Sequence, residues 1–282
     1  MTEAIIVRGL TKAYGDKRAV DGVDLTVDRG EVFALLGPNG AGKTTTVEIL
    51  EGYRRRDGGE VSVLGVDPGA ADAAWRARVG IVLQGTGEFE DLRVEEVVSL
   101  FAGYYPNADD PSSVIDRVGL SEKRRALTHT LSGGQKRRLD VALGIIGRPE
   151  LLFLDEPTTG FDPEARREFW ELIRDLAGGG TTILLTTHYL QEAEELADRV
   201  GVIAAGHMIA VATPGELGGR AESAATVRWY GPDGPQSERT ETPTAFVTRL
   251  SLSFDGGEIP GLTVTRPTLE DTYLAMIEAN AS

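Results

Sequence analysis

The sequence contains no cysteine and no long hydrophobic run. The lack of cysteine excludes disulfide bonds and thiolate metal ligands, and it is compatible with a reducing compartment. Apolar stretches such as 32–36 and 200–205 fall well short of the roughly 18 to 20 residues that span a bilayer. The first residues, Met1-Thr2-Glu3, lack the basic and apolar regions of a secretory signal. We therefore expect a soluble chain in the cytoplasm.

Positive charge is also scarce, because 29 Lys and Arg residues face 44 Asp and Glu residues, for a formal net charge of -15. A nucleic-acid surface needs clustered basic side chains to neutralise phosphates. We therefore expect a solvated acidic surface and no nucleic-acid partner. With 282 residues, the chain is long enough for one large domain, or for one domain with a small appendage.

A glycine-rich stretch at residues 37–44 matches the phosphate-binding pattern G-x-x-x-x-G-K-[ST] at every fixed position. A buried strand is predicted just before it, at 31–36, and a helix just after it. Glycine lets the backbone approach a phosphate closely, so that N–H groups and the helix dipole point at the anion. Lys43 is expected to reach the outer phosphates, and the Thr44 hydroxyl to ligate Mg²⁺. The predicted nucleotide-binding residues here are Gly37, Pro38, Asn39, Gly40, Ala41, Gly42, Lys43, Thr44 and Thr45.

The P-loop by itself does not distinguish a GTPase, a kinase, a helicase and a transporter ATPase. The rest of the chain alternates strands with helices, which indicates an α/β fold. The predicted strands lie at 4–7, 23–27, 60–64, 79–83, 151–154 and 181–186, and the predicted helices at 70–78 and 163–176. Between about 86 and 148 the periodicity is mainly helical, which predicts a helical insertion. We predict a main domain over 1–218 and a small α+β domain over 219–282 that ends in a helix at 269–279.

The run Leu131-Ser132-Gly133-Gly134-Gln135 is a second glycine-rich turn that opens a helix. Taken alone, Ser132 could be an ordinary helix N-cap. Together with the P-loop, however, this run resembles the signature motif of the nucleotide-binding subunits of ATP-binding cassette (ABC) transporters. The resemblance covers about residues 3–217. It implies a P-loop NTPase core of the ABC ATPase type, with an antiparallel β subdomain and a helical signature subdomain.

The resemblance also implies roles for individual residues. The signature residues Ser132, Gly133, Gly134 and Gln135 would contact the γ-phosphate of ATP held by the P-loop of a second copy. The other positions that match family motifs are Tyr14 (adenine stacking), Gln84 (Mg²⁺ sensing and coupling to the membrane subunit), Asp155 (Mg²⁺), Glu156 (polarising the attacking water), Asp162 (D-loop) and His188 (γ-phosphate). Glu156, His188 and Lys43 form the expected catalytic set. Phe161 replaces the usual D-loop leucine, with little expected consequence because it is also large and apolar.

The implied partners are a second copy, in a head-to-tail dimer that sandwiches ATP, and a permease subunit that spans the membrane. The chain would then lie on the inner face of the cell membrane. Residues 267–274 resemble a closing motif of daunorubicin-resistance exporters, which implies export of a drug-like or lipid-like substrate. Locally, the same segment is also explained by an N-cap at Thr268 with Asp271 in the first helical turn. The sequence leaves open whether the chain serves import or export, which substrate is transported, and whether the dimer is a homodimer or a heterodimer.

Two other classes of function fit the sequence less well. ABC ATPases of translation, chromosome maintenance or DNA repair usually carry two cassettes, long coiled-coil insertions or basic surfaces, and the sequence has none of these. A P-loop GTPase or a small-molecule kinase would leave the signature run unexplained. The sequence also lacks the Asn-Lys-x-Asp motif that reads guanine.

Overall fold

The computed structural model describes residues 3–82 and 89–280. Contacts divide the chain into two compact units, Met1–Val211 and Ala212–Ser282, which are described separately. The predicted domain boundary at 218/219 lies seven residues further along the chain and stays a prediction. Gln84 falls outside the described residues, so its expected role is not addressed by the structure. No helix in the described part of the chain combines the length and apolar composition needed to cross a bilayer.

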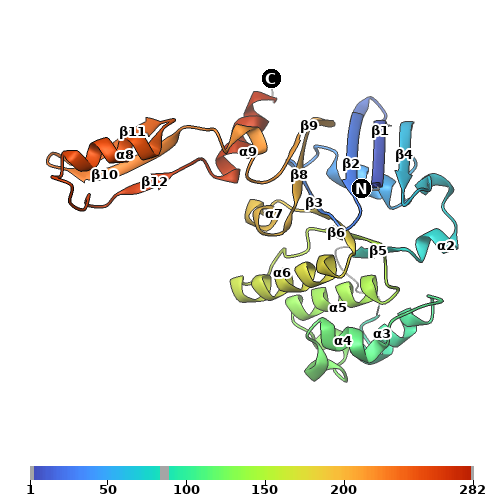
Figure 1. Cartoon of the computed structure of the whole chain (residues 1–282). Coiled ribbons are helices and arrows are strands. Elements are labelled where there is room, and N and C mark those ends of the chain that lie inside the picture. Colours follow the sequence, from blue (N-terminus) through green and yellow to red (C-terminus); the bar gives the residue numbers. More distant parts are fainter. Residues whose placement is uncertain (1–2, 83–88, 281–282) are drawn as a thin grey trace. The chain divides into compact units, whose positions relative to one another are not determined.

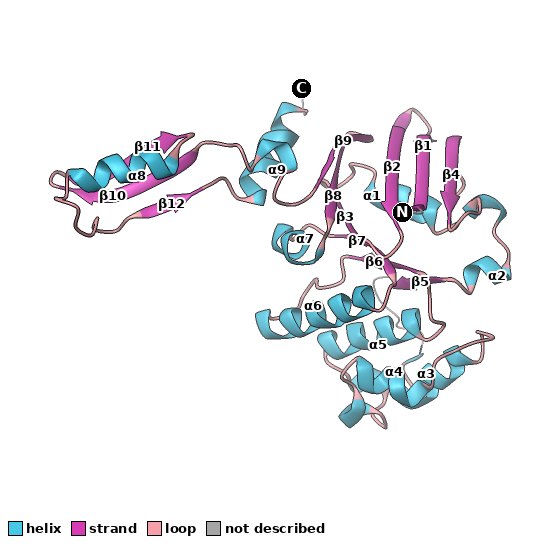
Figure 2. Cartoon of the chain, in the orientation of Figure 1, coloured by secondary structure: helices cyan, strands magenta, loops and turns pink. Residues whose placement is uncertain are grey.

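The first unit is built on a six-stranded sheet with the order β5-β6-β7-β3-β8-β9 (Figures 1 and 2). In the order in which they lie in the sheet, the neighbouring strands β5, β6, β7, β3 and β8 all run parallel to one another. Strands β3 and β7 are buried along their whole length, as is usual in a parallel sheet covered on both faces. The strands are β3 (Val32–Leu36), β5 (Val79–Val82), β6 (Leu151–Asp155), β7 (Thr182–Thr186), β8 (Arg199–Ala204) and β9 (His207–Ala212).

The strand order brings the predicted nucleotide-binding and catalytic residues to one edge of the sheet. Strand β3 lies next to β7, and β7 lies next to β6, all in the same direction. Their carboxyl ends therefore meet at one edge of the sheet, where ligands bind in open α/β sheets. The P-loop follows β3, Asp155 ends β6 with Glu156 directly after it, and His188 follows β7.

A second, antiparallel sheet has the order β2-β1-β4. Its strands are β1 (Glu3–Tyr14), β2 (Lys17–Asp28) and β4 (Gly58–Val63), so the predicted strands 4–7 and 23–27 are fragments of two twelve-residue strands. Register shifts interrupt the pairing of β1 with β2, one of them between Val7 and Leu10. Gly9 lies there with a φ of 56°. Such bulges break the alternation of apolar and polar residues that identifies a strand in sequence.

The predicted helix at 70–78 is shorter in the structure. It consists of a 3₁₀ turn, Pro68–Ala70, and a single helical turn, α2 (Ala73–Arg76). The Asp67 side chain caps the first piece and the Asp72 side chain caps the second. An aspartate that caps a new start favours two short pieces over one continuous helix.

The helices expected between 86 and 148 are present, and Figure 1 shows them grouped together. They are α3 (Val94–Ala102), α4 (Pro111–Arg117) and α5 (Gly133–Ile145), and they pack on one another. Two further helices follow β6 and β7, namely α6 (Pro163–Gly178) and α7 (Leu190–Leu196). The predicted start of α6 is confirmed, because the Asp162 side chain accepts hydrogen bonds from the N–H groups of Glu164 and Ala165.

The P-loop helix α1 (Lys43–Leu50) packs into the main hydrophobic core. That core joins apolar residues of the antiparallel sheet, such as Ile5, to residues of the central sheet, such as Phe33 and Phe153. Val47, Ile49 and Leu50 of α1 belong to the same cluster. Because its sides are packed in this way, α1 holds the phosphate loop rigidly between the two sheets.

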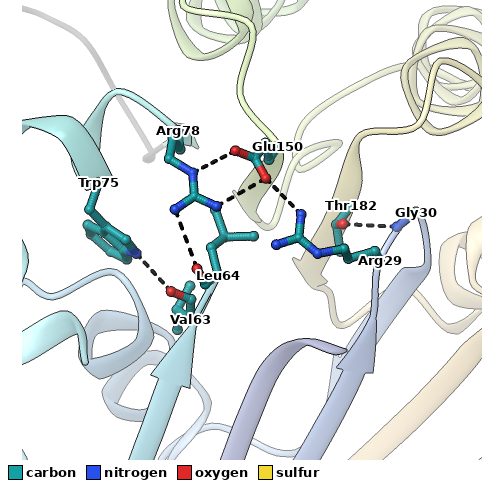
Figure 3. A network of polar contacts seen from close by, with 8 residues as sticks. All are labelled: Arg29, Gly30, Val63, Leu64, Trp75, Arg78, Glu150 and Thr182. Carbon is teal, nitrogen blue, oxygen red and sulfur yellow. Dashed lines mark hydrogen bonds and ion pairs between the residues drawn. The ribbon is translucent and has the colours of Figure 1, made fainter. Parts of the chain in front are cut away.

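A polar cluster also links the two sheets (Figure 3). The Glu150 carboxylate accepts hydrogen bonds from Arg78 Nε at 2.6 Å and from Arg29 Nη1 at 2.7 Å. These contacts, led by that of Arg78, lower the pKa of Glu150 to about 2. Nearby, the indole N–H of Trp75 donates to the Val63 carbonyl at 2.8 Å.

The second unit contains a three-stranded antiparallel sheet, β11-β10-β12, and two helices. Helix α8 (Pro243–Leu252) was not predicted, because three Thr and Ser residues dilute its apolar periodicity. It packs on the sheet through Phe246 and Trp229, whose ring centroids are 5.6 Å apart. The N-cap at Thr268 is confirmed by its capping box with Asp271 at the start of α9 (Leu269–Ala279). The strands are β10 (Ala225–Gly231), β11 (Gly234–Thr240) and β12 (Thr263–Thr265).

Candidate nucleotide site

The phosphate loop is pressed tightly against the elements beside it. A Cβ atom at Gly37 would lie 2.3 Å from the carbonyl oxygen of Ile203, and one at Gly42 would lie 2.3 Å from that of Ala19. Gly42 also has a φ of 109°. Side chains are therefore excluded at both positions, and the loop conformation depends on glycine there.

Lys43, the first residue of α1, lies in this loop with its side chain buried. Its ammonium group donates to the carbonyl of Gly37 at 2.6 Å and to that of Pro38 at 3.1 Å. Burial lowers the pKa of Lys43, while the nearby carboxylates of Glu156 and Asp155 oppose this shift. The ammonium group of Lys43 is thus held between the phosphate loop and the carboxylates of Asp155 and Glu156.

A pocket of about 550 Å³ opens in front of the loop. Its size lies within the range that is typical of small-molecule sites. Tyr14 is 43% exposed, and the centroid of its ring lies 5.3 Å from the Arg54 guanidinium carbon. The pocket brings together residues from distant parts of the sequence: Tyr14, Lys17, Ala19, Asn39, Gly40, Gly42, Lys43, Thr44, Thr45, Asp155 and Glu156.

Hydrogen bonds hold Asp155 and Glu156 in place at the end of β6. The Thr186 hydroxyl donates to the Asp155 carboxylate, and Arg137 Nη2 donates to the Asp155 carbonyl at 2.5 Å. Glu156 adopts a φ of 45°, which is uncommon for a residue with a side chain. Its N–H donates to the Thr186 carbonyl at 3.0 Å, which holds this strained conformation in place.

His188 contacts Glu156, which lines the pocket. Its Nδ1 atom lies 3.2 Å from Glu156 Oε1, and the Thr159 hydroxyl donates to Glu156 Oε2 at 3.3 Å. The imidazole ring also packs on the ring of Tyr189, with centroids 4.1 Å apart. The glutamate side chain is therefore held from two loops, and the structure brings together the three residues predicted to be catalytic.

The signature residues lie elsewhere. Ser132 is the N-cap of α5, and its capping box with Gln135 confirms the local interpretation of this turn. Ser132, Gly134 and Gln135 line a separate pocket of about 660 Å³, which shares no lining residue with the first pocket in the described part of the chain. Asp162 caps α6, and its expected D-loop role stays a prediction.

Lys17 and Thr186 are among the site residues that the sequence did not predict. Lys17 lines the nucleotide pocket and pairs with Tyr14 across the hairpin, which went unnoticed because the strands are longer than predicted. Thr186 pairs in register with Asp155, so its position could be foreseen only with the strand order known.

The described residues contain no group of three or more His, Asp or Glu side chains that could hold a metal ion by themselves. Asp155 and the hydroxyl of Thr44 do line the same pocket. A carboxylate and a hydroxyl are hard oxygen ligands of the type that Mg²⁺ prefers, and Mg²⁺ usually completes its shell with water and phosphate oxygens. The donor set therefore fits Mg²⁺ only together with a phosphate ligand.

The fold and this pocket define a P-loop nucleoside triphosphatase. A family profile described as "ABC transporter" matches residues 20–159. The chain is 46% identical over 222 residues to the daunorubicin resistance ATP-binding protein DrrA3 of Streptomyces coeruleorubidus, a match that covers 76% of this chain and 69% of that protein. It is 41% identical over 295 residues to the Nod factor export ATP-binding protein I of Rhizobium meliloti, covering 98% of this chain and 88% of that protein.

Solved structures of ABC ATP-binding subunits have the same fold as the first unit of this chain. The structure of cbiO1 from Clostridium perfringens, part of the ABC transporter complex cbiONQ, superposes with a TM-score of 0.71 at 28% identity, covering 77% of this chain and 91% of that one. An ATP-binding cassette solved as a dimer with ADP and Pi shares the fold, with a TM-score of 0.67 at 23% identity and coverage of 74% and 98%. The chain belongs to the ABC transporter family and is an ATP-binding subunit with ATPase activity.

Proposed function

We propose that this chain drives export of a drug-like or lipid-like compound through a separate permease subunit, on the inner face of the cell membrane. The observation that carries the catalytic part is the meeting of Lys43, Asp155 and Glu156 in one pocket at the carboxyl edge of the sheet. The direction of transport is inferred from relatives that are named for daunorubicin resistance and for Nod factor export.

In this proposal the P-loop amides and Lys43 hold the phosphates of ATP, and Lys17 adds a second positive charge in the same pocket. Tyr14 stacks on the adenine. Glu156 orients the attacking water and accepts its proton, while His188 contacts the γ-phosphate and keeps the glutamate in place. Phosphoryl transfer depends mainly on such positioning and charge stabilisation.

Mg²⁺ would be held by Asp155 and Thr44, with Gln84 as a further expected ligand. When bound, the ion would neutralise charge on the phosphates. The chain's own contribution is to fix Asp155, which is done by the Thr186 hydroxyl and by Arg137. Removal of Mg²⁺ with EDTA should abolish hydrolysis.

We infer that each complete site needs two copies of the chain. The separation of the signature residues from the nucleotide pocket supports this arrangement. Ser132, Gly133, Gly134 and Gln135 of one copy would face ATP on the P-loop of the other, and Asp162 would lie at the shared interface. The backbone N–H groups at the start of α5 would then point towards the γ-phosphate.

Mixing two inactive variants tests the shared site. Lys43→Ala removes the P-loop cation and Ser132→Arg blocks the signature turn, so each variant alone should lack activity. A mixed dimer has one site with an intact P-loop and an intact signature. An equal mixture should therefore recover about a quarter of the wild-type rate, because half of the dimers are mixed and each holds one good site. If each chain hydrolysed ATP on its own, mixing would recover nothing.

Export is tested separately in vesicles. The chain is co-expressed with the membrane protein that co-purifies with it, and ATP-driven movement of a fluorescent organic compound is followed in inverted vesicles. Accumulation inside these vesicles, lost with Glu156→Gln, would support export. Loss of compound from preloaded vesicles would support import, and failure to associate with any membrane protein would contradict the transport role.

A further inference from the structure

Tyr14, the residue proposed to stack on adenine, is an exposed side chain at the end of a strand. It is the last residue of β1, where it pairs with Lys17 at the start of β2. Its side chain lines the nucleotide pocket. A side chain that becomes ordered only when a ligand binds loses conformational entropy, and this lowers the affinity. The orientation of the Tyr14 ring before ATP binds therefore affects how tightly adenine is held.

Two cations lie over this ring. The guanidinium carbon of Arg54 is 5.3 Å from the ring centroid, and the ammonium nitrogen of Lys12 is 5.7 Å from it. Both distances are within the roughly 6 Å over which a cation is attracted to an aromatic ring. In the described part of the chain, neither residue lines the nucleotide pocket, and Arg54 lines a different one. The two cations therefore contact the ring from outside the nucleotide pocket.

Arg54 is fixed to the end of the P-loop helix α1. Gly52 follows this helix with a φ of 75°. The N–H of Gly52 donates to the Ile49 carbonyl at 3.1 Å, and the N–H of Tyr53 donates to the Glu48 carbonyl at 2.9 Å. This is the Schellman motif, in which glycine reverses the chain after a helix. The reversal brings Arg54 back beside α1, where its Nε donates to the Glu48 carboxylate at 2.5 Å.

A cation behind the ring should favour a purine in front of it. Aromatic faces carry negative partial charge, so two stacked rings repel each other electrostatically when they lie face to face. A cation on the opposite face of the tyrosine offsets this repulsion. The guanidinium of Arg54 is planar and can stack on the ring. Lys12 has a compact ammonium group, lies slightly further away and pairs with Asp57 at 2.7 Å. Arg54 is therefore the better of the two to fix the ring.

We propose that Arg54 is a positioning residue for the nucleotide base: held by Glu48, it packs on Tyr14 from outside the pocket and keeps the ring ready to stack on adenine. This inference rests on the stacking role of Tyr14 in the proposed function. Because Glu48 belongs to α1, the base-binding ring is tied to the same helix that begins at Lys43 in the phosphate loop. One helix then sets the distance between the sites for adenine and for the phosphates.

Calorimetric titration of the full chain with ATP and with inorganic triphosphate tests the proposal, in the presence of EDTA so that neither compound is hydrolysed. Inorganic triphosphate carries the phosphates without the base. Arg54→Ala should weaken ATP binding about threefold, as for loss of an exposed cation–π contact, and leave triphosphate binding unchanged. Arg55→Ala is the matched control, because it removes the same charge from the exposed neighbouring residue. It should leave both affinities unchanged.

A double-mutant cycle with Tyr14→Ala shows whether Arg54 acts through the ring. Tyr14→Ala should weaken ATP binding about tenfold, as for loss of one base–aromatic stack, and should spare triphosphate. Adding Arg54→Ala to Tyr14→Ala should then have no further effect, because the contact is already lost. In steady-state assays with Mg²⁺, Arg54→Ala should raise the KM for ATP and leave kcat unchanged, which indicates lost binding and not a distorted catalytic site. Thermal melting verifies that each variant is folded.

Three results would overturn the proposal. ATP binding could be unchanged in Arg54→Ala, or it could weaken together with triphosphate binding, which would indicate a general effect of charge on the phosphates. The loss could also persist in the Tyr14→Ala background, so that Arg54 would act independently of the ring. If Tyr14→Ala itself bound ATP as tightly as the wild type, the stacking role in the proposed function would be wrong, and this inference with it.

Discussion

The Nδ1 atom of His188 lies 3.2 Å from Oε1 of Glu156, although the two residues follow different strands of the central sheet. The contact forms because β6 and β7 are adjacent and parallel, so that the loops after them meet. Glu156 is also held by Thr159 on its other oxygen. A carboxylate fixed in this way is well placed to orient a water molecule.

Replacing Glu156 with Gln should reduce ATP hydrolysis by at least about a hundredfold, because the amide cannot accept a proton from the water. ATP binding should be retained, since the P-loop is unchanged. Size-exclusion chromatography with ATP and Mg²⁺ should then show a stable dimer. Hydrolysis at the wild-type rate would disprove the catalytic role of this residue.

Replacing His188 with Ala should slow hydrolysis by about a hundredfold, as for loss of one hydrogen-bond donor to a reacting phosphate. His129 provides a matched control, because its ring bonds to the Glu90 carbonyl and lies outside the pocket. His129→Ala should keep the wild-type rate. Steady-state ATPase assays at saturating ATP measure both variants. Equal rates for the two would mean that His188 is only a structural neighbour of Glu156.

Replacing Thr186 with Val removes the hydroxyl that donates to the Asp155 carboxylate while keeping a β-branched side chain in the strand. The Mg²⁺ concentration for half-maximal hydrolysis should rise about tenfold, since a hydrogen bond to a charged group is lost. Thr182→Val is the control on the same strand. The Thr182 hydroxyl accepts from the N–H of Gly30 at 2.9 Å and does not contact Asp155, so this change should lower stability without altering the Mg²⁺ dependence.

Glu150 should make folding stability depend on pH. Its two arginine contacts lower its pKa from 4.5 to about 2, so its stabilising contribution is complete above about pH 4.5 and is lost as the pH falls towards 2. The side chain is 41% exposed, so solvent screening limits the contribution to about 1 kcal/mol. Denaturant unfolding at pH 7 should show Glu150→Gln to be less stable by about this amount, and the difference should shrink at pH 3. An undiminished difference at pH 3 would contradict this account.

The unpredicted features follow from how distant segments pair. The long strands β1 and β2 were predicted only in part, because bulges such as that at Gly9 disturb their alternation. Lys17 was missed for the same reason, since it faces Tyr14 only once the hairpin is complete. The C-terminal helix, by contrast, was predicted with its observed bounds, because its capping box and its apolar periodicity are both local.

The sequence alone determined the chemistry that is local to one turn: the phosphate loop with Lys43 and Thr44, the signature turn at Ser132, and the carboxylates Asp155 and Glu156 at the end of a buried strand. Backbone conformation within such a turn depends on a few adjacent residues, so their order encodes it. The tertiary structure decided which of these turns share a pocket. It placed His188 against Glu156 and kept the signature residues in a different pocket. Strand order and helix packing set these distances, and a hydrophobic run does not specify which strand it will pair with.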